Sequence, residues 1–268
     1  MIGIGLRQRL LEAGHAAHAI PRDAPVPACD AVVNLAGEPI AQRWTPAAKK
    51  RIYDSRVEGT RRLVHALSAQ SQRPGVLVCA SAVGVYGSRG DEILTEKSSP
   101  GAGFLPHVVT DWEESAQTAE ALGIRVISLR FGMVLGRGGA LAKLLPLFRL
   151  GVGGRLGSGR QWMSWIHIDD AVSLILLALE NAALRGAVNA TAPHPVTNDE
   201  FTRRLAGALH RPAIFPAPAF ALKLALGEMS EVLLDSQRVL PVAALATGFH
   251  FQYPELSVAF ANILSTFQ

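Results

Sequence analysis

The sequence predicts an α/β protein with a doubly wound, mostly parallel sheet and a small, mainly helical C-terminal region. Short β-rich runs alternate with helical stretches between residues 4 and 190. The runs at 31–33 and 76–78 are continuously apolar, which is typical of parallel strands buried on both faces. After residue 220 the pattern is helical.

The expected strands are short and lie between the helical stretches. They span residues 18–20, 31–35, 76–81, 126–130, 165–168 and 188–190.

Helices are expected where apolar residues recur at helical spacing after a capping residue. They span residues 4–13, 46–69 after Thr45, 108–122, and 171–181 after Asp169 or Asp170, and one follows the capping box 197–200. In the helix at 108–122, Trp112 is expected to face the core, and Glu113 and Glu114 the solvent.

Glycine clusters at 136–139, 151–154 and 157–159 predict loops, and the Pro-rich segment 211–218 predicts a linker. We therefore expect the doubly wound sheet to form a domain at 1–150 that returns at 161–191. Substrate-side segments and the linker would span 151–219, and a small helical domain 220–268.

The composition excludes several classes of protein. With 49% hydrophobic and 18% charged residues, the chain is not disordered. A net charge of +4, with its basic clusters mixed with acidic residues, favours a solvated helix face over nucleic-acid binding. Two cysteines are too few for a metal cluster, and the longest apolar run is too short to span a membrane. We expect a cytoplasmic protein without a metal or membrane partner.

The chain begins with Met1-Ile2-Gly3 directly before the first helix. A Rossmann-like unit normally places a strand and a Gly-rich turn there, to hold a pyrophosphate at the helix N-terminus. The first strand and most of this turn are therefore expected to be missing, and seven residues between Arg22 and Asp30 leave no room for an edge strand. We expect an incorrectly assigned start site, or else an eroded protein, and weak NADP binding by the chain as written.

Two features favour a nucleotide. The turn Asn34-Leu35-Ala36-Gly37 follows a parallel strand, and its small residues would let a flat ring lie on the backbone. The alternative is a plain strand-to-loop turn. Arg22 follows the strand at 18–20, where an arginine can bind a 2′-phosphate, so NADP is favoured over NAD. The alternative is an exposed loop arginine.

Four longer motifs, at 30–40, 81–87, 129–136 and 157–161 with 165–170, resemble the extended short-chain dehydrogenase/reductases. The chain is most similar to the nucleoside-diphosphate-sugar epimerase-like subgroup, whose short C-terminal domain of unknown function resembles residues 227–264. This resemblance covers essentially the whole chain and implies a nucleotide-sugar or small carbonyl substrate.

The resemblance also implies roles for single residues. Gly3 matches the last glycine of the family's turn, and Arg22 the residue at the NADP phosphate. Leu35 and Ala36 match the turn beside the adenosine, Arg56 a helix position facing the cofactor, and Val134 a position near the nicotinamide.

The family's catalytic Tyr-x-x-x-Lys pair is absent. The residues four positions after Tyr53, Tyr86 and Tyr253 are Val57, Gly90 and Ser257. Leu105 and Val109 stand nearest the expected places. Ser81 matches the family's catalytic hydroxyl, although Ala82 aligns about as well.

Other polar residues are candidates. His107 could shuttle protons if it meets Asp111 and Tyr86 near the crevice. His167 and Asp170 are expected to fix a strand-to-helix junction rather than hold a metal.

Arg160 and Gln161, on a glycine-rich loop, could contact an anionic or sugar substrate together with Tyr86, or lie on a plain surface loop.

These observations favour an NADP-binding epimerase- or reductase-like protein. The alternative is a catalytically inactive NADP-binding sensor or scaffold, since the acid/base pair is missing. The helix at 47–69 could pair two copies into a homodimer, or pack only on its own sheet.

Overall fold

The computed structural model describes residues 1–21 and 24–265. Its α-helices are α1 Ile2–Glu12, α2 Pro46–Ser68, α3 Phe104–Gln117, α4 Gly139–Arg149, α5 Ile168–Glu180, α6 Asn198–Ala208, α7 Ala219–Leu226, α8 Glu231–Leu234, α9 Val242–Ala246 and α10 Leu256–Ser265. Short 3₁₀ helices are η1 Val83–Tyr86, η2 Thr118–Leu122 and η3 Gly227–Ser230. The strands are β1 Ala31–Asn34, β2 Val76–Ala82, β3 Ile93–Leu94, β4 Arg125–Phe131, β5 Met133–Leu135, β6 Trp162–Met163, β7 Trp165–His167, β8 Gly186–Ala190, β9 Val196–Thr197 and β10 Arg238–Val239.

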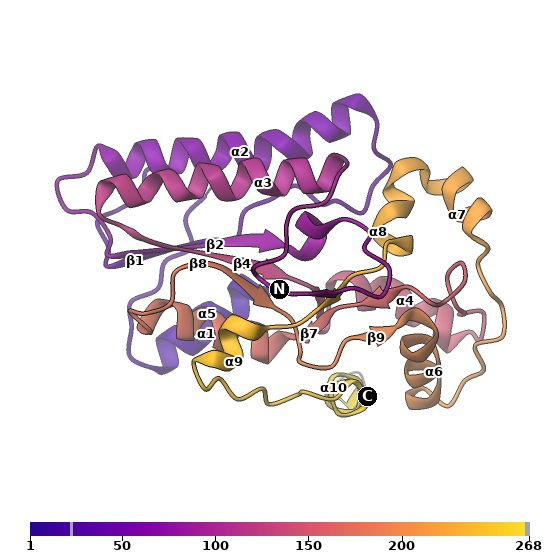
Figure 1. The fold of residues 1–268 in the computed structure, drawn as a ribbon. Coiled ribbons are helices and arrows are strands. Elements are labelled where there is room, and N and C mark those ends of the chain that lie inside the picture. The colour runs from indigo at the N-terminus through magenta and orange to yellow at the C-terminus, as the bar shows by residue number, and fades with distance from the viewer. Residues whose placement is uncertain (22–23, 266–268) are drawn as a thin grey trace.

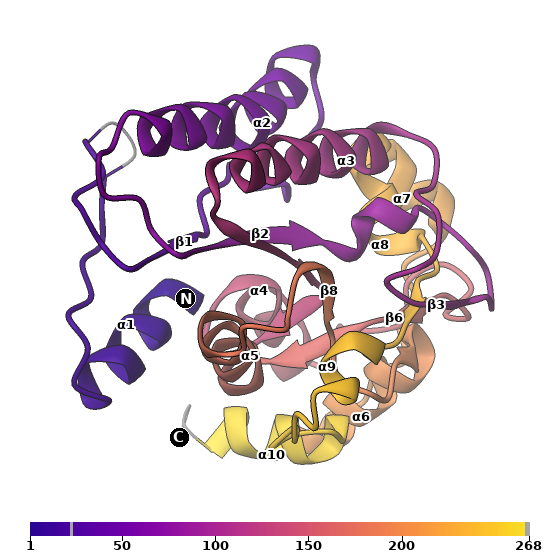
Figure 2. The same cartoon turned by 60° about the vertical axis from the view of Figure 1, so that its left-hand side comes forward.

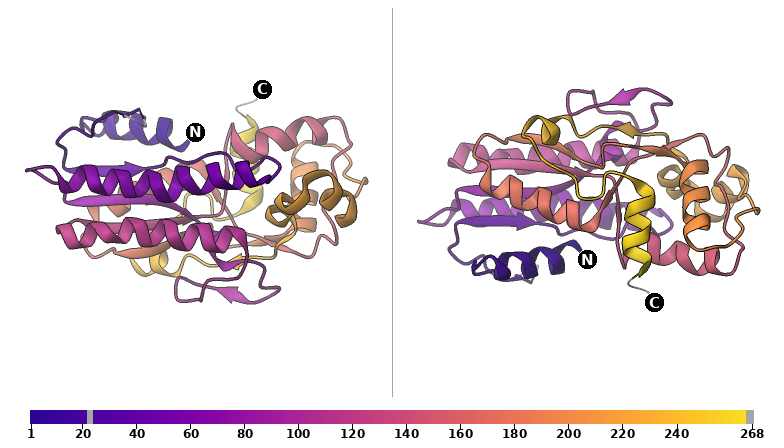
Figure 3. Two further views of the ribbon diagram at one scale, coloured as in Figure 1. Left: turned by 90° about the horizontal axis from the view of Figure 1, so that it is seen from above. Right: turned by 90° about the horizontal axis from the view of Figure 1, so that it is seen from below.

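In the described part of the chain, the main sheet has four parallel strands in the order β1-β2-β4-β8. Helices α2 and α3 lie side by side over one face (Figure 1; Figure 3, left), and α1 and α5 lie over the other (Figure 2). This arrangement confirms the doubly wound, parallel α/β fold. Three further strand pairs lie outside the main sheet: β5 with β7, β6 with β9, and β3 with β10.

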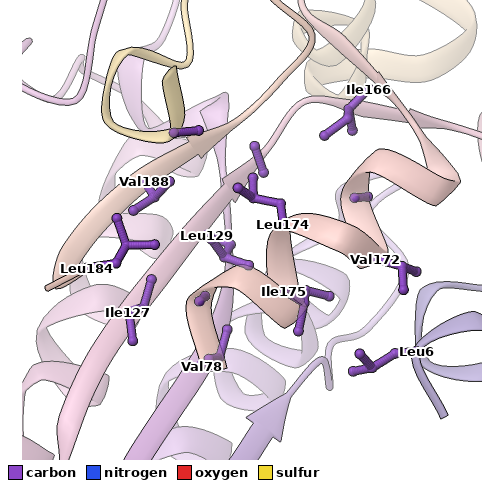
Figure 4. Close-up of a cluster of buried hydrophobic side chains, with 14 of the residues drawn as sticks. Leu6, Val78, Ile127, Leu129, Ile166, Val172, Leu174, Ile175, Leu184 and Val188 are labelled. Atoms are coloured by element: carbon purple, nitrogen blue, oxygen red, sulfur yellow. The ribbon is translucent and has the colours of Figure 1, made fainter. Parts of the chain in front are cut away.

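The main core lies between the sheet and α5. Val78 of β2, and Ile127 and Leu129 of β4, face Leu174 and Ile175 of α5, and all five are fully buried (Figure 4). A fully buried side chain of this size contributes about 1.5–3 kcal/mol to folding. The continuous apolar runs of the sequence therefore correspond to strands covered on both faces, as expected.

The expectation of a strand at residues 18–20 is wrong. Residues 18–20 form no regular structure and are exposed. No strand of the described sheet lies beside them to pair with, since β1, the strand at that edge, pairs only with β2. A three-residue segment without a neighbouring strand cannot satisfy its backbone groups in a sheet.

The cap of α5 also differs from the expected one. Neither Asp169 nor Asp170 caps this helix. Instead, His167 is the N-cap residue, and its Nδ1 accepts a hydrogen bond from Asp169 N at 3.1 Å. The two carboxylates lie in the first helical turn, where they interact favourably with the helix dipole.

Helix α4 lies between two glycine clusters and was not expected. It begins at Gly139, within the cluster at 136–139, and buries Leu141, Leu145 and Phe148 along one face. Their spacing of four and three residues is that of an amphipathic helix. Among the described residues, no helix is both long and apolar enough to cross a membrane.

Candidate functional site

The carboxyl ends of β1, β2, β4 and β8 lie along one edge of the sheet because all four strands are parallel. In Figure 1 this edge faces α8, toward which the arrowhead of β2 points. We call the segments that leave it, residues 34–38, 83–87 and 131–134, the carboxyl edge. Ligands of open α/β sheets bind at this edge.

Asn34 holds the turn after β1 in shape. Its Nδ2 donates to Thr60 Oγ1 at 3.1 Å, and its Oδ1 accepts from Ala36 N at 3.2 Å. Beyond Ala36, the backbone of Gly37 lies against Arg56, and an added Cβ would come within 3.1 Å of a guanidinium nitrogen. Glycine at this position therefore lets Arg56 approach the turn closely.

Arg56 projects from α2 onto this turn. Its Nη1 donates to Glu38 O at 3.0 Å, and its guanidinium carbon lies 5.3 Å from the ring centroid of Trp112. Burial lowers the pKa of Arg56, although the negative charge of Glu38 opposes this shift. Among the described residues Arg56 forms no salt bridge, so its charge remains available to an anion at the carboxyl edge.

The N-terminus of α1 lies at the same edge. An added Cβ on Gly3 would lie 3.7 Å from Leu35 Cδ1, and Met1 Sδ lies against Gly136, just after β5 with its Val134. The first turn of α1 has no side-chain cap, so its backbone N–H groups are free to bind an anion. The structure thus places Gly3 and Leu35 together at the start of α1, with Val134 two residues before the Gly136 that Met1 contacts. The cofactor contacts of these three residues stay a prediction.

Arg22 lies outside the described residues. Its expected contact with a 2′-phosphate stays a prediction, and so does the preference for NADP that depended on it. Ala36 and Arg56 both lie at the turn after β1, on the carboxyl edge.

A buried polar network connects β2, α3 and β4 behind this edge. Arg130 donates to both carboxylate oxygens of Glu113, at 2.8 and 2.7 Å, and Ser81 Oγ donates to Glu113 Oε1 at 2.5 Å. Arg130 Nη1 also donates to the Tyr86 hydroxyl at 2.9 Å, which in turn donates to Asn189 Oδ1 at 2.7 Å. Ser81 and Tyr86, expected as catalytic and substrate residues, are therefore both buried and hydrogen-bonded to protein groups.

The charges in this network stabilise one another. Burial alone would lower the pKa of Arg130, but its hydrogen bonds and charge interactions with Glu113 and Tyr86 raise that pKa instead. Burial also raises the pKa of Tyr86, against the effect of Arg130. The Tyr86 hydroxyl is consequently held in its neutral form, as a donor to Asn189.

Glu113 was expected to face solvent beside Glu114, and this expectation is wrong. Its carboxylate turns inward because Arg130, on the neighbouring β4, is buried and needs a counter-charge. The two residues come from different elements, so no periodic pattern links them. Arg130, an arginine inside the buried part of the strand Arg125–Phe131, is the signal from which a buried acidic partner could have been inferred.

His107 lies apart from this network. It is exposed on α3, with Nδ1 3.6 Å from one carboxylate oxygen of Asp111, whose other oxygen accepts from Tyr53 OH at 2.7 Å. The expected meeting of His107 and Asp111 with Tyr86 does not occur, because the Tyr86 hydroxyl is bound to Asn189 and Arg130. Instead, His107 lies beside Asp111 because the two residues are four positions apart on the same helix.

Leu105 and Val109, the residues nearest the places expected for the family's Tyr and Lys, lie in apolar contacts. Leu105 packs on Gly84, with 3.6 Å between its Cδ1 and an added Cβ, and Val109 is buried against η1. A leucine or valine here cannot exchange a proton with a substrate.

A cavity of about 610 Å³ lies between the glycine-rich loop at 157–161 and the C-terminal helices. Its wall includes Ser158 and Gln161 from the loop and Lys223, Glu231 and Asp235 from α7, α8 and the residue after α8. Gln161 is buried, and its Nε2 donates to Leu156 O and Leu233 O, so its amide oxygen is the atom left for a ligand. Arg160 is exposed on the adjoining loop.

Acidic groups dominate the charged wall of this cavity. Burial, together with the nearby negative charge of Glu231, raises the pKa of Asp235 to about 6. Near neutral pH the wall therefore carries a partly protonated Asp235 beside Glu228, Glu231 and Lys223.

His167 and Asp170 form a structural junction. The carboxylate of Asp170 accepts from Gln252 N at 2.7 Å and Tyr253 N at 3.0 Å, and the His167 ring stacks on Tyr253 at 3.8 Å between centroids. In the described residues no group of three or more His, Cys, Asp or Glu side chains could hold a metal ion. The junction ties the C-terminal segment to the start of α5.

Comparison with known families matches both parts of the chain. Residues 22–190 match the NAD dependent epimerase/dehydratase family, and residues 217–263 match a domain of unknown function, DUF1731. Epimerase family protein YfhF of Bacillus subtilis is 41% identical over 241 residues, which are 90% of this chain and 80% of that protein. A chloroplastic SDR39U1 homolog of Arabidopsis thaliana is 46% identical over 87% of this chain and 68% of its own length.

Solved structures agree with these sequence matches. The human epimerase family protein SDR39U1, isoform 2, crystallised with NADPH, has a TM-score of 0.91 at 34% identity and covers 99% of this chain and 96% of its own. A nucleoside-diphosphate sugar epimerase from Corynebacterium glutamicum has a TM-score of 0.81 at 33% identity, and this chain spans 56% of its length. The family match extends over more than half of the chain, and the fold, the sequence and the C-terminal segment all agree with it: the chain belongs to the NAD dependent epimerase/dehydratase family.

Proposed function

We propose that this chain binds NADP at the carboxyl edge and acts as an epimerase- or reductase-like protein on a nucleotide-sugar or small carbonyl substrate. One observation carries the proposal: Arg56, without a salt-bridge partner among the described residues, lies on the Gly37 turn at the same edge as the uncapped N-terminus of α1. A cation and free N–H groups at the end of parallel strands suit a dinucleotide's phosphates. The relative crystallised with NADPH supports this choice of cofactor.

NADPH titration, followed by fluorescence, tests the proposal. We expect Arg56→Gln to weaken NADPH binding by roughly tenfold, because a charge-assisted phosphate contact is lost. Arg61→Gln is the matched control, since Arg61 is exposed on the same helix and pairs with Glu58. Equal affinities for both variants and the parent would remove Arg56 from the cofactor site.

The preference for NADP over NAD rests on Arg22. We expect NADPH to bind more tightly than NADH, and Arg22→Ala to reduce that difference while NADH binding stays the same. Equal binding of the two nucleotides by the parent chain would contradict this assignment.

For the substrate, we infer that the cavity beside the glycine-rich loop receives its sugar or carbonyl portion. Gln161 presents an amide oxygen in the cavity wall, and the exposed Arg160 can contact an anionic group at its mouth. Turnover with a panel of nucleotide-sugars and small carbonyls tests this. Arg160→Gln should raise the KM of any substrate found, whereas Arg9→Gln, exposed on α1, should not.

A catalytically inactive NADP-binding sensor or scaffold is the second candidate. The observation that favours it is the packing of Leu105 on Gly84, since Leu105 is the residue nearest the place expected for the family's catalytic tyrosine. NADPH binding without turnover across the panel would support this candidate over the enzyme.

We also propose the expected domain boundaries. Residues 1–150 with 161–191 would form the nucleotide-binding domain, 151–219 the substrate-side segments and linker, and 220–268 the C-terminal domain. Limited proteolysis should then cut first near 211–218, the Pro-rich segment. The expected cytoplasmic location and homodimer stay predictions.

A further inference from the structure

Helix α7 is apolar but has little covering it. Its sequence from Ala219 to Leu226 contains one charged residue, Lys223, and none of its eight residues is buried in the described structure. Phe220 is 74% exposed and Leu224 80% exposed. A helix this apolar is normally packed inside a protein or against a partner.

More apolar side chains are exposed next to it. Leu150, at the end of α4, is 76% exposed, and Val152, Ile214 and Phe215 are exposed as well. The chain segments that carry them run side by side, because Ala217 N donates to Arg155 O at 2.9 Å and Gly157 N to Ala217 O at 2.8 Å. Both views of Figure 3, like Figure 1, place α4 and α7 at the same end of the molecule.

We call these six side chains the apolar end. It consists of Leu150, Val152, Ile214, Phe215, Phe220 and Leu224.

The two sequence segments that carry the apolar end have charged side chains of one sign. Residues 139–160 and 207–227 contain no Asp or Glu. Their basic residues are Lys143, Arg149, Arg155, Arg160, Arg211 and Lys223. Glu228, Glu231 and Asp235, which follow α7 in the chain, line the cavity together with Lys223. An occupant with an apolar interior and an anionic surface would complement this combination.

A second copy of the chain fits these charges less well. A symmetric pair would bring the same patch of both copies together and so place their basic side chains opposite one another. A bilayer of anionic lipids offers negative headgroups above an apolar layer, in the geometry that a partly exposed apolar helix can enter. Since this mode needs only shallow insertion, it is compatible with the absence, in the described residues, of a helix able to cross a membrane.

We propose that the apolar end attaches this protein peripherally to a membrane surface rich in anionic lipids. Phe220 and Leu224 insert among the acyl chains, and Lys143 and Arg211 contact lipid phosphates. The lack of a long apolar run predicted that the protein has no membrane partner, but attachment to a membrane surface needs no spanning segment.

Cosedimentation of the whole chain with vesicles tests the proposal. Vesicles of phosphatidylcholine with about a third phosphatidylglycerol should bind the protein at least tenfold more tightly than pure phosphatidylcholine, because the basic residues add an electrostatic contribution. Raising the salt from about 0.1 M to 0.5 M should weaken this binding, since the Debye length shrinks.

Two pairs of variants separate the apolar from the electrostatic contribution. The double variant Phe220→Ser/Leu224→Ser should lose at least tenfold in vesicle affinity, whereas Leu245→Ser/Val258→Ser, exposed on α9 and α10, should lose none. Lys143→Gln/Arg211→Gln should weaken binding to anionic vesicles only, and Arg9→Gln/Lys97→Gln, also exposed, serves as its control. Thermal melting shows whether each variant is folded.

Three results would overturn the proposal. The protein could bind both kinds of vesicle equally well, it could bind neither, or the Phe220→Ser/Leu224→Ser variant could bind anionic vesicles as tightly as the parent. Light scattering tests whether a second copy covers the apolar end instead. A parent protein that is a dimer and a Phe220→Ser/Leu224→Ser variant that is a monomer would show that it does.

Discussion

At the scale of single residues, a buried pair of opposite charges is expected to contribute most to stability. Arg130 and Glu113 form a two-point salt bridge behind the carboxyl edge, with Ser81 bound to the same carboxylate. Removing one partner of such a pair leaves the other charge buried without compensation. The pair therefore matters more to stability than the exposed ion pairs of α2, such as Lys50 with Asp54.

We expect Glu113→Gln to lower the free energy of unfolding by about 3 kcal/mol, because the buried guanidinium of Arg130 loses its counter-charge. Urea unfolding followed by circular dichroism measures the change. Glu114→Gln is the control, since Glu114 is the next residue along α3 and is exposed. A loss of less than about 1 kcal/mol in Glu113→Gln would show that solvent reaches the pair.

Asp235 provides a pH-dependent contribution. Burial and Glu231 raise its folded pKa from 3.8 to about 6, so folding favours the protonated carboxyl. The corresponding stability is fully present below about pH 4 and is lost as pH rises through 6.

Asp235→Asn should therefore raise the free energy of unfolding by roughly 1 kcal/mol at pH 7.5, after allowance for partial solvent exposure, and leave it almost unchanged at pH 4. Melting temperatures at both pH values check this. An equal change at the two pH values would assign the effect to packing rather than charge.

At the scale of elements, the sequence predicted helices and strands correctly where the signal involved only residues close together in the chain. Thr45 caps α2 as expected, with its side chain accepting from Ala48 N, and Pro46 stands in the first turn. The apolar runs at 31–35 and 76–81 are strands of the parallel sheet. Such signals depend on neighbours in the chain alone.

Expectations that depended on distant partners failed. Residues 18–20 have no strand to pair with, and the inward turn of Glu113 depends on a residue from another element. The carboxyl edge could be anticipated because parallel strands must end together, which is a rule of topology. The buried network and the cavity could not, since they join elements far apart in sequence.

For α2 itself, we expect Thr45→Ala to cost about 1 kcal/mol of stability, because Ala48 N loses its acceptor. Thr45→Ser keeps a hydroxyl and should cost less than half as much. Both are measured from urea midpoints, and equal losses for the two variants would show that the methyl group, and not the cap, matters.

The molecule as a whole is held together by contacts between its C-terminal segment and the main fold. Asp170 receives two backbone N–H groups from residues 252 and 253, and β10 pairs with β3. Glu96 Oε1 adds a third tie, since it accepts from Ala243 N at 3.1 Å and from Asn189 N at 3.0 Å.

Asp170→Ala should release the C-terminal segment, because hydrogen bonds to a carboxylate are worth about 1.5–3 kcal/mol each. Hydrogen exchange of α10 should accelerate by tenfold or more, while amides in β2 and β4 keep their protection. Asp170→Asn, which keeps one acceptor oxygen, should show an intermediate effect. Uniform acceleration throughout the chain would instead indicate global destabilisation.

The pairing of β3 with β10 has a consequence for how the chain is made. Ser88 Oγ accepts from Ser236 N, so the segment around residue 88 pairs only after a segment 148 residues further along has been made. During synthesis at about 5–20 residues per second, the edge of β3 stays unpaired for roughly 10–30 seconds. Newly made chains therefore pass through a stage in which β2 and β4 can already pair while β3 is open to chaperones or to other nascent chains.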